Sequence, residues 1–342
     1  MSPPRIEPFR VLLVDERRRL PGLAAGLFQR GTLVRVGEGT TPERMLEAVL
    51  QVRPNVIVLD LTAGEAAYQA IEAVMAERPT PILVLHQPGT DPFRALAMGA
   101  LDMSDLPAHP SEAFWNELSR KLVLLAQVRV VQHVRGKRNR RRRPQENGRS
   151  ESEPPFPLVA IAASLGGPKA LAQLLSMLPG GLVAPICICQ HISEGFTYGL
   201  AQWLAAESGH PVVEARDNEL LEPGNIYVAP SRFHFCVDKP GRVRLDAGSP
   251  IQGFRPSCDA LLESVARSFG RRAIGVILTG MGRDGAAGLK AIRDRGGRTI
   301  AQDEATCVVY GMPREAVQIG AAQEVLPLEK IPSTLVRWVD EC

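Results

Sequence analysis

The chain has 342 residues, of which 45% are hydrophobic and 23% charged, and its formal net charge is +3. This length exceeds one typical domain and suits two, each long enough to bury its own core. No run approaches the roughly 18 consecutive apolar residues of a transmembrane helix. The N-terminal MSPPRIEPFR lacks the apolar core of a secretory signal. We therefore expect a cytoplasmic protein that is not an integral membrane protein.

The six cysteines indicate a reduced protein. None forms a C-x-x-C pair, and their spacing fits no zinc template. Cys187 and Cys189 lie inside an apolar run, where a thiol behaves as a small hydrophobic side chain. The cysteines therefore predict neither a disulfide framework nor a structural metal.

The first part of the chain alternates strand-like and helix-like stretches. Short apolar runs predict strands at 9–16, 33–38, 55–61 and 81–86. Helical spacing appears at 42–52, 66–77, 91–98 and about 111–134. Such alternation predicts α/β architecture, with a parallel sheet covered on both faces. We expect five strands in a flavodoxin-like, doubly wound fold over residues 1–134.

The next stretch, 135–155, has no apolar periodicity. Eight basic residues and one acid, Glu146, fall between positions 135 and 149, and a Ser/Glu/Pro-rich segment follows. Like charges repel and build no core, so we predict a basic linker. Binding to nucleic acid or to an anionic membrane surface is the alternative. The lack of interleaved aromatic residues disfavours it, and no nucleic-acid partner is expected.

The alternation resumes over residues 156–342 and predicts a second doubly wound α/β domain. Strands are expected at 158–164, 184–191, 273–279 and 299–302, with short strand-like pieces between 212 and 247. Helices are expected at 168–178, 196–208, 257–269 and 285–295, with two more near the end.

Three polar residues of this domain lie at or just after predicted strand ends. Ser164 ends the first strand, His191 ends the second, and Asp284 lies in the turn after the strand 273–279. Ligands of open parallel sheets bind at the carboxyl ends of the strands. A hydroxyl, an imidazole and a carboxylate delivered to one edge satisfy the needs of nucleophilic catalysis. Ser164, His191 and Asp284 are therefore the candidate catalytic residues.

The surroundings of Ser164 favour the nucleophile role. It lies in A-S-L-G-G-P, between a buried strand and a helix, where Gly166 and Gly167 permit close backbone approach. Backbone N–H groups at a helix N-terminus can stabilise an oxyanion. The segment differs from the G-x-S-x-G elbow of α/β-hydrolases. Taken alone, Ser164 is better explained as a helix N-cap, a position that serine favours.

Two alternatives concern the other members of this set. His234, in SRFHF, is the second candidate for the base. Gly280-x-Gly282-x-x-Gly285 follows a strand and precedes a helix, as in a dinucleotide-binding fingerprint. The fingerprint normally opens its domain, however, and the short remainder of this chain cannot build the sheet that a dinucleotide needs.

Several longer segments resemble the catalytic domain of the CheB-type chemotaxis methylesterases: AIAASLGGP, QHISEGFT, FRPSCD, GVILTGMGRDGAAG and TIAQDEATCVVYGMPREA. The resemblance implies hydrolysis of γ-glutamyl methyl esters on chemoreceptors, deamidation of some receptor glutamines, and no cofactor for catalysis. It also implies nucleophile, base and acid roles for Ser164, His191 and Asp284. The amide of Met281, together with Gly166, becomes an oxyanion candidate, and Arg255 a residue that positions the substrate helix.

The first domain resembles the phosphorylatable receiver of the same family only in part. Asp60 matches the phospho-acceptor, and Asp15 and Glu16 match the acidic pair that binds Mg²⁺. The family's Ser/Thr is His86 here, and its Lys is Leu106. We therefore predict a degenerate receiver whose phospho-switch is weakened or lost.

Three functions follow in order of preference. The first is a protein-glutamate methylesterase gated by its N-terminal domain, with chemoreceptor helices as substrate and a histidine kinase as a possible partner. The second is a non-catalytic regulatory module. The third is a nucleotide-binding protein that uses the glycine-rich loop.

Overall fold

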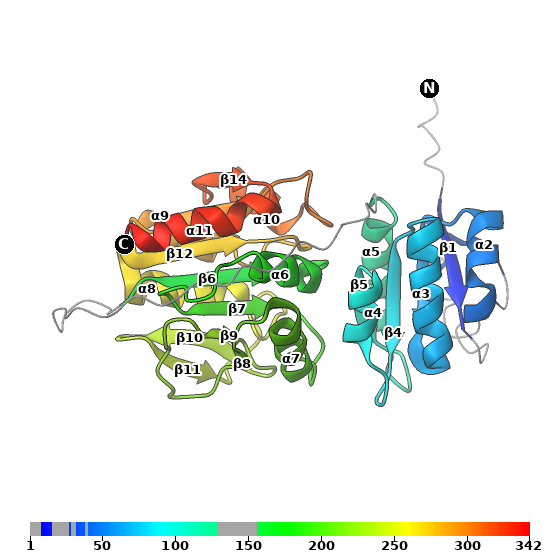
Figure 1. The fold of residues 1–342 in the computed structure, drawn as a ribbon, viewed down its shortest axis with the longest axis horizontal. Helices are drawn as coiled ribbons and strands as arrows, with labels where there is room; N and C mark the ends of the chain where they lie inside the picture. The colour runs from blue at the N-terminus through cyan, green and yellow to red at the C-terminus, as the bar shows by residue number, and fades with distance from the viewer. Residues whose placement is uncertain (1–7, 16–26, 29–31, 38–39, 129–155) are drawn as a thin grey trace, which may run out of the picture. The chain divides into compact units, whose positions relative to one another are not determined.

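The computed structural model describes residues 8–15, 27–28, 32–37, 40–128 and 156–342 (Figure 1). The chain divides into two compact units, Met1–Arg135 and Gly136–Cys342. The predicted linker lies entirely outside the described residues, and so does Glu16. Its boundaries with the two domains remain predictions.

The N-terminal unit is a five-stranded parallel sheet. Its strands run in the order β2-β1-β3-β4-β5, which is the flavodoxin-like order predicted from the alternation. The strands are β1 (Phe9–Val14), β2 (Leu33–Arg35), β3 (Val56–Asp60), β4 (Ile82–His86) and β5 (Asp102–Asp105). All of β3 and β4 is buried, as expected of a sheet covered on both faces.

Four α-helices of this unit are described. They are α2 (Met45–Val52), α3 (Glu65–Glu77), α4 (Pro92–Met98) and α5 (Glu112–Leu125). The helical spacing of the sequence predicted that the last helix extends to about residue 134. This is wrong for residues 126–128, where the helix has already ended at Leu125, and 129–134 lie outside the described residues.

The second unit contains a seven-stranded, fully parallel sheet in the order β14-β13-β12-β6-β7-β9-β8. Its strands are β6 (Leu158–Ala163), β7 (Ile186–Gln190), β8 (Val212–Glu214), β9 (Ile226–Val228), β12 (Ala273–Ile277), β13 (Arg298–Gln302) and β14 (Glu324–Leu326). The three central strands β12, β6 and β7 are buried along their whole length. Near-continuous apolar runs at these positions reflect burial on both faces.

Helices cover both faces of this sheet. Figure 1 shows α6 (Gly167–Ser176), α7 (Thr197–Ser208) and α11 (Ile331–Asp340) in front, with α8 (Cys258–Phe269) and α9 (Ala286–Asp294) behind. The short α10 (Met312–Gln318) packs against α9 and β13. The two-faced cover confirms the predicted doubly wound α/β class.

Strand-like pieces were expected between 212 and 247, but the pairing of two strands there into an antiparallel ribbon was not predicted. The ribbon consists of β10 (His234–Asp238) and β11 (Arg242–Asp246) and packs on α8 through the fully buried Phe235. The α8 hydroxyls complete the hydrogen bonding of Val237: Ser264 Oγ accepts from its N–H at 2.9 Å, and Ser268 Oγ donates to its carbonyl at 2.8 Å. The ribbon is therefore an integral part of the α8 layer.

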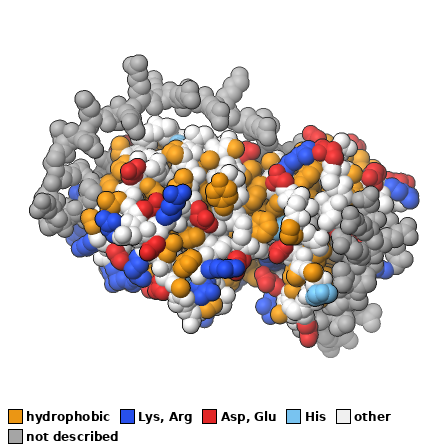
Figure 2. Space-filling model, turned by 90° about the horizontal axis from the view of Figure 1, so that it is seen from below, with side chains coloured by type: hydrophobic (Ala, Val, Ile, Leu, Met, Phe, Trp, Pro, Cys, Tyr) orange, Lys and Arg blue, Asp and Glu red, His pale blue; other side chains and the backbone are white. Residues whose placement is uncertain are grey.

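The surface carries mixed charge. In Figure 2 basic and acidic side chains are interspersed, with hydrophobic side chains exposed between them. Within the described part of the chain, no helix is both long and apolar enough to cross a membrane.

Candidate active site

The three candidate residues follow three adjacent strands. Strands β12, β6 and β7 are neighbours in the sheet, and Ser164, His191 and Asp284 come after their carboxyl ends. Ser164 N–H donates to Thr279 O at 3.1 Å, and His191 N–H donates to Ala163 O at 3.1 Å. The backbones of nucleophile and base candidates are thus fixed side by side at one edge, as the sequence predicted.

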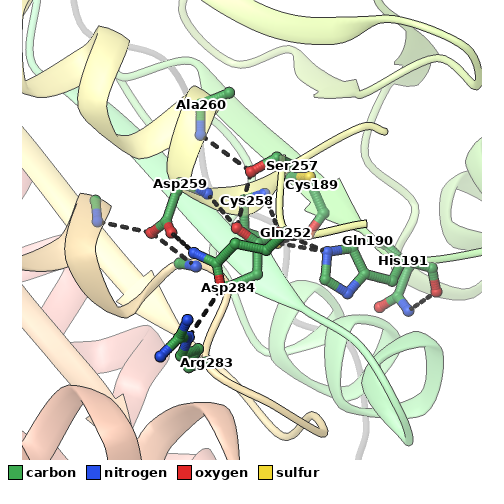
Figure 3. Close-up of polar contacts among 12 residues, drawn as sticks. Cys189, Gln190, His191, Gln252, Ser257, Cys258, Asp259, Ala260, Arg283 and Asp284 are labelled. Carbon is green, nitrogen blue, oxygen red and sulfur yellow. Dashed lines mark hydrogen bonds and ion pairs between the residues drawn. The ribbon is translucent and has the colours of Figure 1, made fainter. Parts of the chain in front are cut away.

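Gln190 ties these two backbones together. Its side-chain amide donates to Ser164 O at 2.8 Å. The same amide donates to His191 O, also at 2.8 Å (Figure 3). Gln190 is 2% exposed, so each of these bonds is made out of contact with water. The sequence indicated only that Gln190 could form local hydrogen bonds, because Ser164 lies 26 positions away.

Two glycines make room for this arrangement. A Cβ on Gly167 would lie 2.0 Å from Gln190 Oε1, and a Cβ on Gly166 would lie 2.5 Å from Val308 Cβ. Gly166 also has φ +76°, a left-handed conformation that side chains disfavour. The predicted need for small residues after Ser164 therefore has a direct steric cause.

Asp284 lies at the N-terminus of α8. Its carboxylate accepts hydrogen bonds from Cys258 N at 2.7 Å, Asp259 N at 2.9 Å and Ser257 Oγ at 2.8 Å (Figure 3). The two N–H donors belong to the start of a helix, where such groups lack intrahelical partners and the helix dipole favours an anion, and the third donor is a hydroxyl. Burial raises the pKa of Asp284. His191 and these N–H groups lower it by a larger amount, so the pKa of Asp284 lies below its usual value.

Asp284 also holds the imidazole of His191. His191 Nε2 lies 2.8 Å from Asp284 Oδ2, while His191 Nδ1 has no hydrogen-bond partner among the described residues. In the serine protease arrangement the aspartate holds Nδ1 and leaves Nε2 for the serine. Here the two nitrogens exchange roles, and Nδ1 is the nitrogen left for a reacting proton.

The charge of Asp284 acts on the titration of His191. Burial lowers the pKa of His191, whereas Cys258 and Asp284 raise it, and the net direction is upward from 6.5. The Cys258 thiol, 3.6 Å from Nε2, remains protonated because burial raises its own pKa well above 9.0. We therefore assign the rise to the Asp284 carboxylate.

A second buried carboxylate, Asp259, links the start of α8, where it lies, to the start of α9. Its Oδ1 accepts from Gly285 N at 2.9 Å and Gly288 N at 2.8 Å, at the start of α9 (Figure 3). Burial and the neighbouring Asp284 raise the pKa of Asp259 to about 6. Because a protein carboxylate occupies this helix N-terminus, the pyrophosphate of a dinucleotide has no place there. The glycine-rich loop thus serves the Asp284 turn, which argues against the nucleotide alternative.

The alternative base, His234, has both ring nitrogens engaged. Nε2 lies 3.0 Å from Ser249 O, and Nδ1 accepts from Ser257 N at 3.3 Å. His234 is therefore a buried structural residue.

The remaining substrate-site candidates are placed as follows. Met281 lies in the loop after β12, and no hydrogen bond among the described residues engages its N–H, which leaves that donor available. Arg255 is exposed and donates through Nη1 to Ala247 O at 3.1 Å and Gly248 O at 2.9 Å. It braces its own loop, so its predicted contact with a substrate helix remains a prediction.

One group of potential metal ligands is present among the described residues. The ligand atoms of His191, Cys258 and Asp284 lie within 4.8 Å of one another. Asp284, however, already accepts hydrogen bonds on both oxygens, and the thiol remains protonated. This donor set fits a hydrogen-bonded triad better than a resident metal.

The carboxyl edge of the N-terminal sheet carries the two described acids of the predicted phosphorylation site, Asp15 and Asp60. Asp60 ends β3 and is buried, with Oδ1 accepting from Thr62 N at 2.9 Å. Asp15 follows the adjacent β1 and is buried too, so both carboxylates leave the sheet at one edge and suit Mg²⁺. Burial lowers the pKa of His86 to about 4, so it is neutral, and Leu106 is buried and apolar.

The fold and this geometry define a class: an α/β protein with a candidate Ser-His-Asp site at the carboxyl edge of a parallel sheet. Residues 159–335 match the family model described as CheB methylesterase. The chain belongs to this family. The family and fold class expected from the motifs are thereby confirmed.

Individual relatives extend the likeness to nearly the whole chain. Protein-glutamate methylesterase FrzG of Myxococcus xanthus is 55% identical over 339 residues, covering 98% of this chain and 99% of the relative. Protein-glutamate methylesterase/protein-glutamine glutaminase 2 of Anaeromyxobacter dehalogenans is 44% identical and covers 96% of each. The Thermotoga maritima CheB methylesterase catalytic domain is 41% identical, with a TM-score of 0.52 over 54% of this chain and 99% of that domain.

Proposed function

We propose that this protein is a protein-glutamate methylesterase that hydrolyses glutamyl methyl esters on methyl-accepting chemoreceptors and also deamidates receptor glutamines. The relatives that carry these names match it over nearly their full length. The single observation that carries the proposal is the His191–Asp284 contact of 2.8 Å, beside a serine fixed on the neighbouring strand.

In the proposed first step His191 Nδ1 takes the proton of Ser164 as Oγ attacks the ester carbonyl. The carbonyl oxygen becomes an oxyanion, for which the N–H groups of Met281 and of the α6 start near Gly166 are candidate donors. The tetrahedral intermediate collapses to a glutamyl ester of Ser164. Methanol leaves with the proton that His191 returns.

In the second step His191 takes a proton from water, which attacks the glutamyl ester. The bond to Ser164 Oγ breaks, Oγ regains a proton, and the glutamate side chain is released. Asp284 fixes the imidazole through Nε2 and stabilises its cation in both steps. With a glutamine substrate, ammonia leaves in place of methanol. None of these steps requires a metal.

Substituting Ser164→Ala tests the proposal. We expect methanol release from a methylated receptor to fall at least about a thousandfold, since the nucleophile is removed. Ser176→Ala is the matched control, because this exposed serine ends α6 and its hydroxyl donates to Gln173 O in the same helix. Retained activity in Ser164→Ala would remove Ser164 from the nucleophile role.

The N-terminal unit is proposed to regulate the esterase as a degenerate receiver. Asp60 would accept a phosphoryl group from a histidine kinase partner. Asp15 and Glu16 would hold Mg²⁺. A Mg²⁺ held by these residues would offset the negative charge of the carboxylates and of the phosphoryl group. Position 106 carries leucine, so it supplies no positive charge to pair with a phosphorylated Asp60. We therefore propose that Asp60 is phosphorylated weakly and that phosphorylation changes the esterase activity little. Action on chemoreceptor cytoplasmic helices places the proposed site of action in the cytoplasm.

A further inference from the structure

A phenylalanine ring covers one face of the candidate base. The rings of Phe254 and His191 lie with centroids 3.9 Å apart and planes 1° from parallel. Asp284 already holds the imidazole at Nε2, which fixes one edge of the ring. The stack opposes tilting out of the ring plane, so that Nδ1 keeps a single direction.

Phe254 is carried by a tight turn. Ile251 N–H donates to Phe254 O at 3.0 Å, and Phe254 N–H donates to Ile251 O at 2.9 Å. The two residues between them, Gln252 and Gly253, have φ values of +51° and +89°. The left-handed backbone at Gln252 is unfavourable for a residue with a side chain and therefore needs support from its surroundings.

That support comes from the side chain of Gln252. Its Nε2 donates to Asp259 Oδ2 at 3.1 Å, and its Oε1 accepts from Arg283 Nε at 3.0 Å (Figure 3). Asp259 belongs to the start of α8, and Arg283 adjoins Asp284. The turn is thus tied to the segment that donates hydrogen bonds to the Asp284 carboxylate and to the segment that carries Asp284 itself.

Resting on the proposed function, we propose that Phe254 is a positioning residue for His191. Its ring face keeps the imidazole in the orientation that directs Nδ1 toward the reacting proton, and it stabilises the imidazolium formed in each step. A cation over an aromatic face is attracted by the negative potential of that face. Phe254 therefore supports the base from the side that Asp284 does not reach.

The effect of the Phe254 ring on His191 can be measured separately from the effect of the neighbouring titratable groups. Asp284 and the neutral Cys258 thiol are the titratable groups that act on the imidazole directly. Asp259 donates its N–H to Asp284, and Arg283 donates to the side chain of Gln252; neither hydrogen-bonds to the imidazole. A Phe254→Leu substitution changes none of these groups and removes only the aromatic face.

Two readouts in the full-length protein test the proposal. The first is the His191 pKa from NMR titration of isotope-labelled histidine, and the second is kcat and KM for methyl ester hydrolysis. We expect Phe254→Leu to lower the His191 pKa by roughly half a unit to one unit, since cation–π attraction is lost. We expect kcat to fall about threefold to tenfold, with KM nearly unchanged. Phe233→Leu, which removes a partly exposed ring outside the His191 stack, should change neither.

Phe254→Trp keeps an aromatic face and should keep the His191 pKa at or above the wild-type value. This variant decides the matter if Phe254→Leu does not fold. A His191 pKa that stays unchanged in folded Phe254→Leu, or that falls in folded Phe254→Trp, would overturn the proposal. Failure of the proposed function is distinguishable, because an enzyme inactive on methylated receptor would still show the predicted pKa shift.

Discussion

The two units place chemistry-bearing residues by the same rule but equip them differently. In the second unit, Ser164, His191 and Asp284 leave three adjacent strands, and Asp284 is surrounded by donors. In the first, Asp15 and Asp60 leave adjacent strands, yet the neighbouring positions carry a neutral His86 and an apolar Leu106. A parallel sheet thus fixes where a site can form, whereas the side chains around that place decide what it can do.

The largest effect is expected from breaking the better-equipped edge at Asp284. Asp284→Asn keeps the size of the side chain but removes its charge. It also replaces the carboxylate beside Nε2 of His191 with a neutral amide. We expect kcat to fall about 10⁴-fold, since the imidazole loses its fixed tautomer and its counterion. Esterase assays on methylated receptor measure this. A loss below tenfold in a folded variant would show that the carboxylate does not orient the base.

A smaller effect is expected from the Gln190 amide that joins nucleophile and base. Gln190→Leu leaves His191 O without its donor, which costs about 1–3 kcal/mol of stability. Ser164 O loses one of its two donors and keeps the N–H of Gly167 at 2.8 Å. We expect a lower unfolding temperature and a fall in kcat of roughly tenfold to a hundredfold, because the two strand ends lose their register. An unchanged kcat would show that the strands alone fix the site.

The pH profile tests the electrostatics of the same edge. Asp284 raises the pKa of His191 above 6.5, and only the neutral imidazole can accept the Ser164 proton. The sign follows: activity is present above the His191 pKa and lost as the pH falls through it. We expect the acidic limb of kcat/KM to lie above pH 6.5. A limb well below that value would contradict the assigned role of Asp284.

The smallest effect is expected at the carboxyl edge of the N-terminal sheet, the proposed phosphorylation site. Acetyl phosphate with Mg²⁺ should change esterase activity of the full chain by less than about twofold, because no lysine at 106 or hydroxyl at 86 responds to a phosphate. Mass spectrometry of the Asp60 peptide measures the labelling, with Asp60→Asn as the control. Robust labelling at Asp60 would show that the edge of the N-terminal sheet is a functional phosphorylation site despite His86 and Leu106.

The sequence predicted what depends on strand ends and missed what depends on distant packing. Most strands of both sheets and the positions of Ser164, His191 and Asp284 follow from alternating apolar runs, but the edge strand β14 was not predicted. The donors to Asp284 at 257–259 lie about 26 positions away in sequence, and periodicity carries no information about such pairs. The stack of Phe254 on His191 was missed for the same reason, although FRPSCD marked the segment as part of the family pattern.

Trapping the covalent intermediate tests the central claim most directly. Rapid acid quenching of the full-length enzyme during turnover of a methylated receptor peptide, followed by proteolysis and mass spectrometry, would locate the glutamyl adduct. The account predicts an adduct on Ser164 that is absent from Ser164→Ala and accumulates less in Asp284→Asn. An adduct on another residue, or an active enzyme whose peptide around Ser164 never carries one, would contradict it.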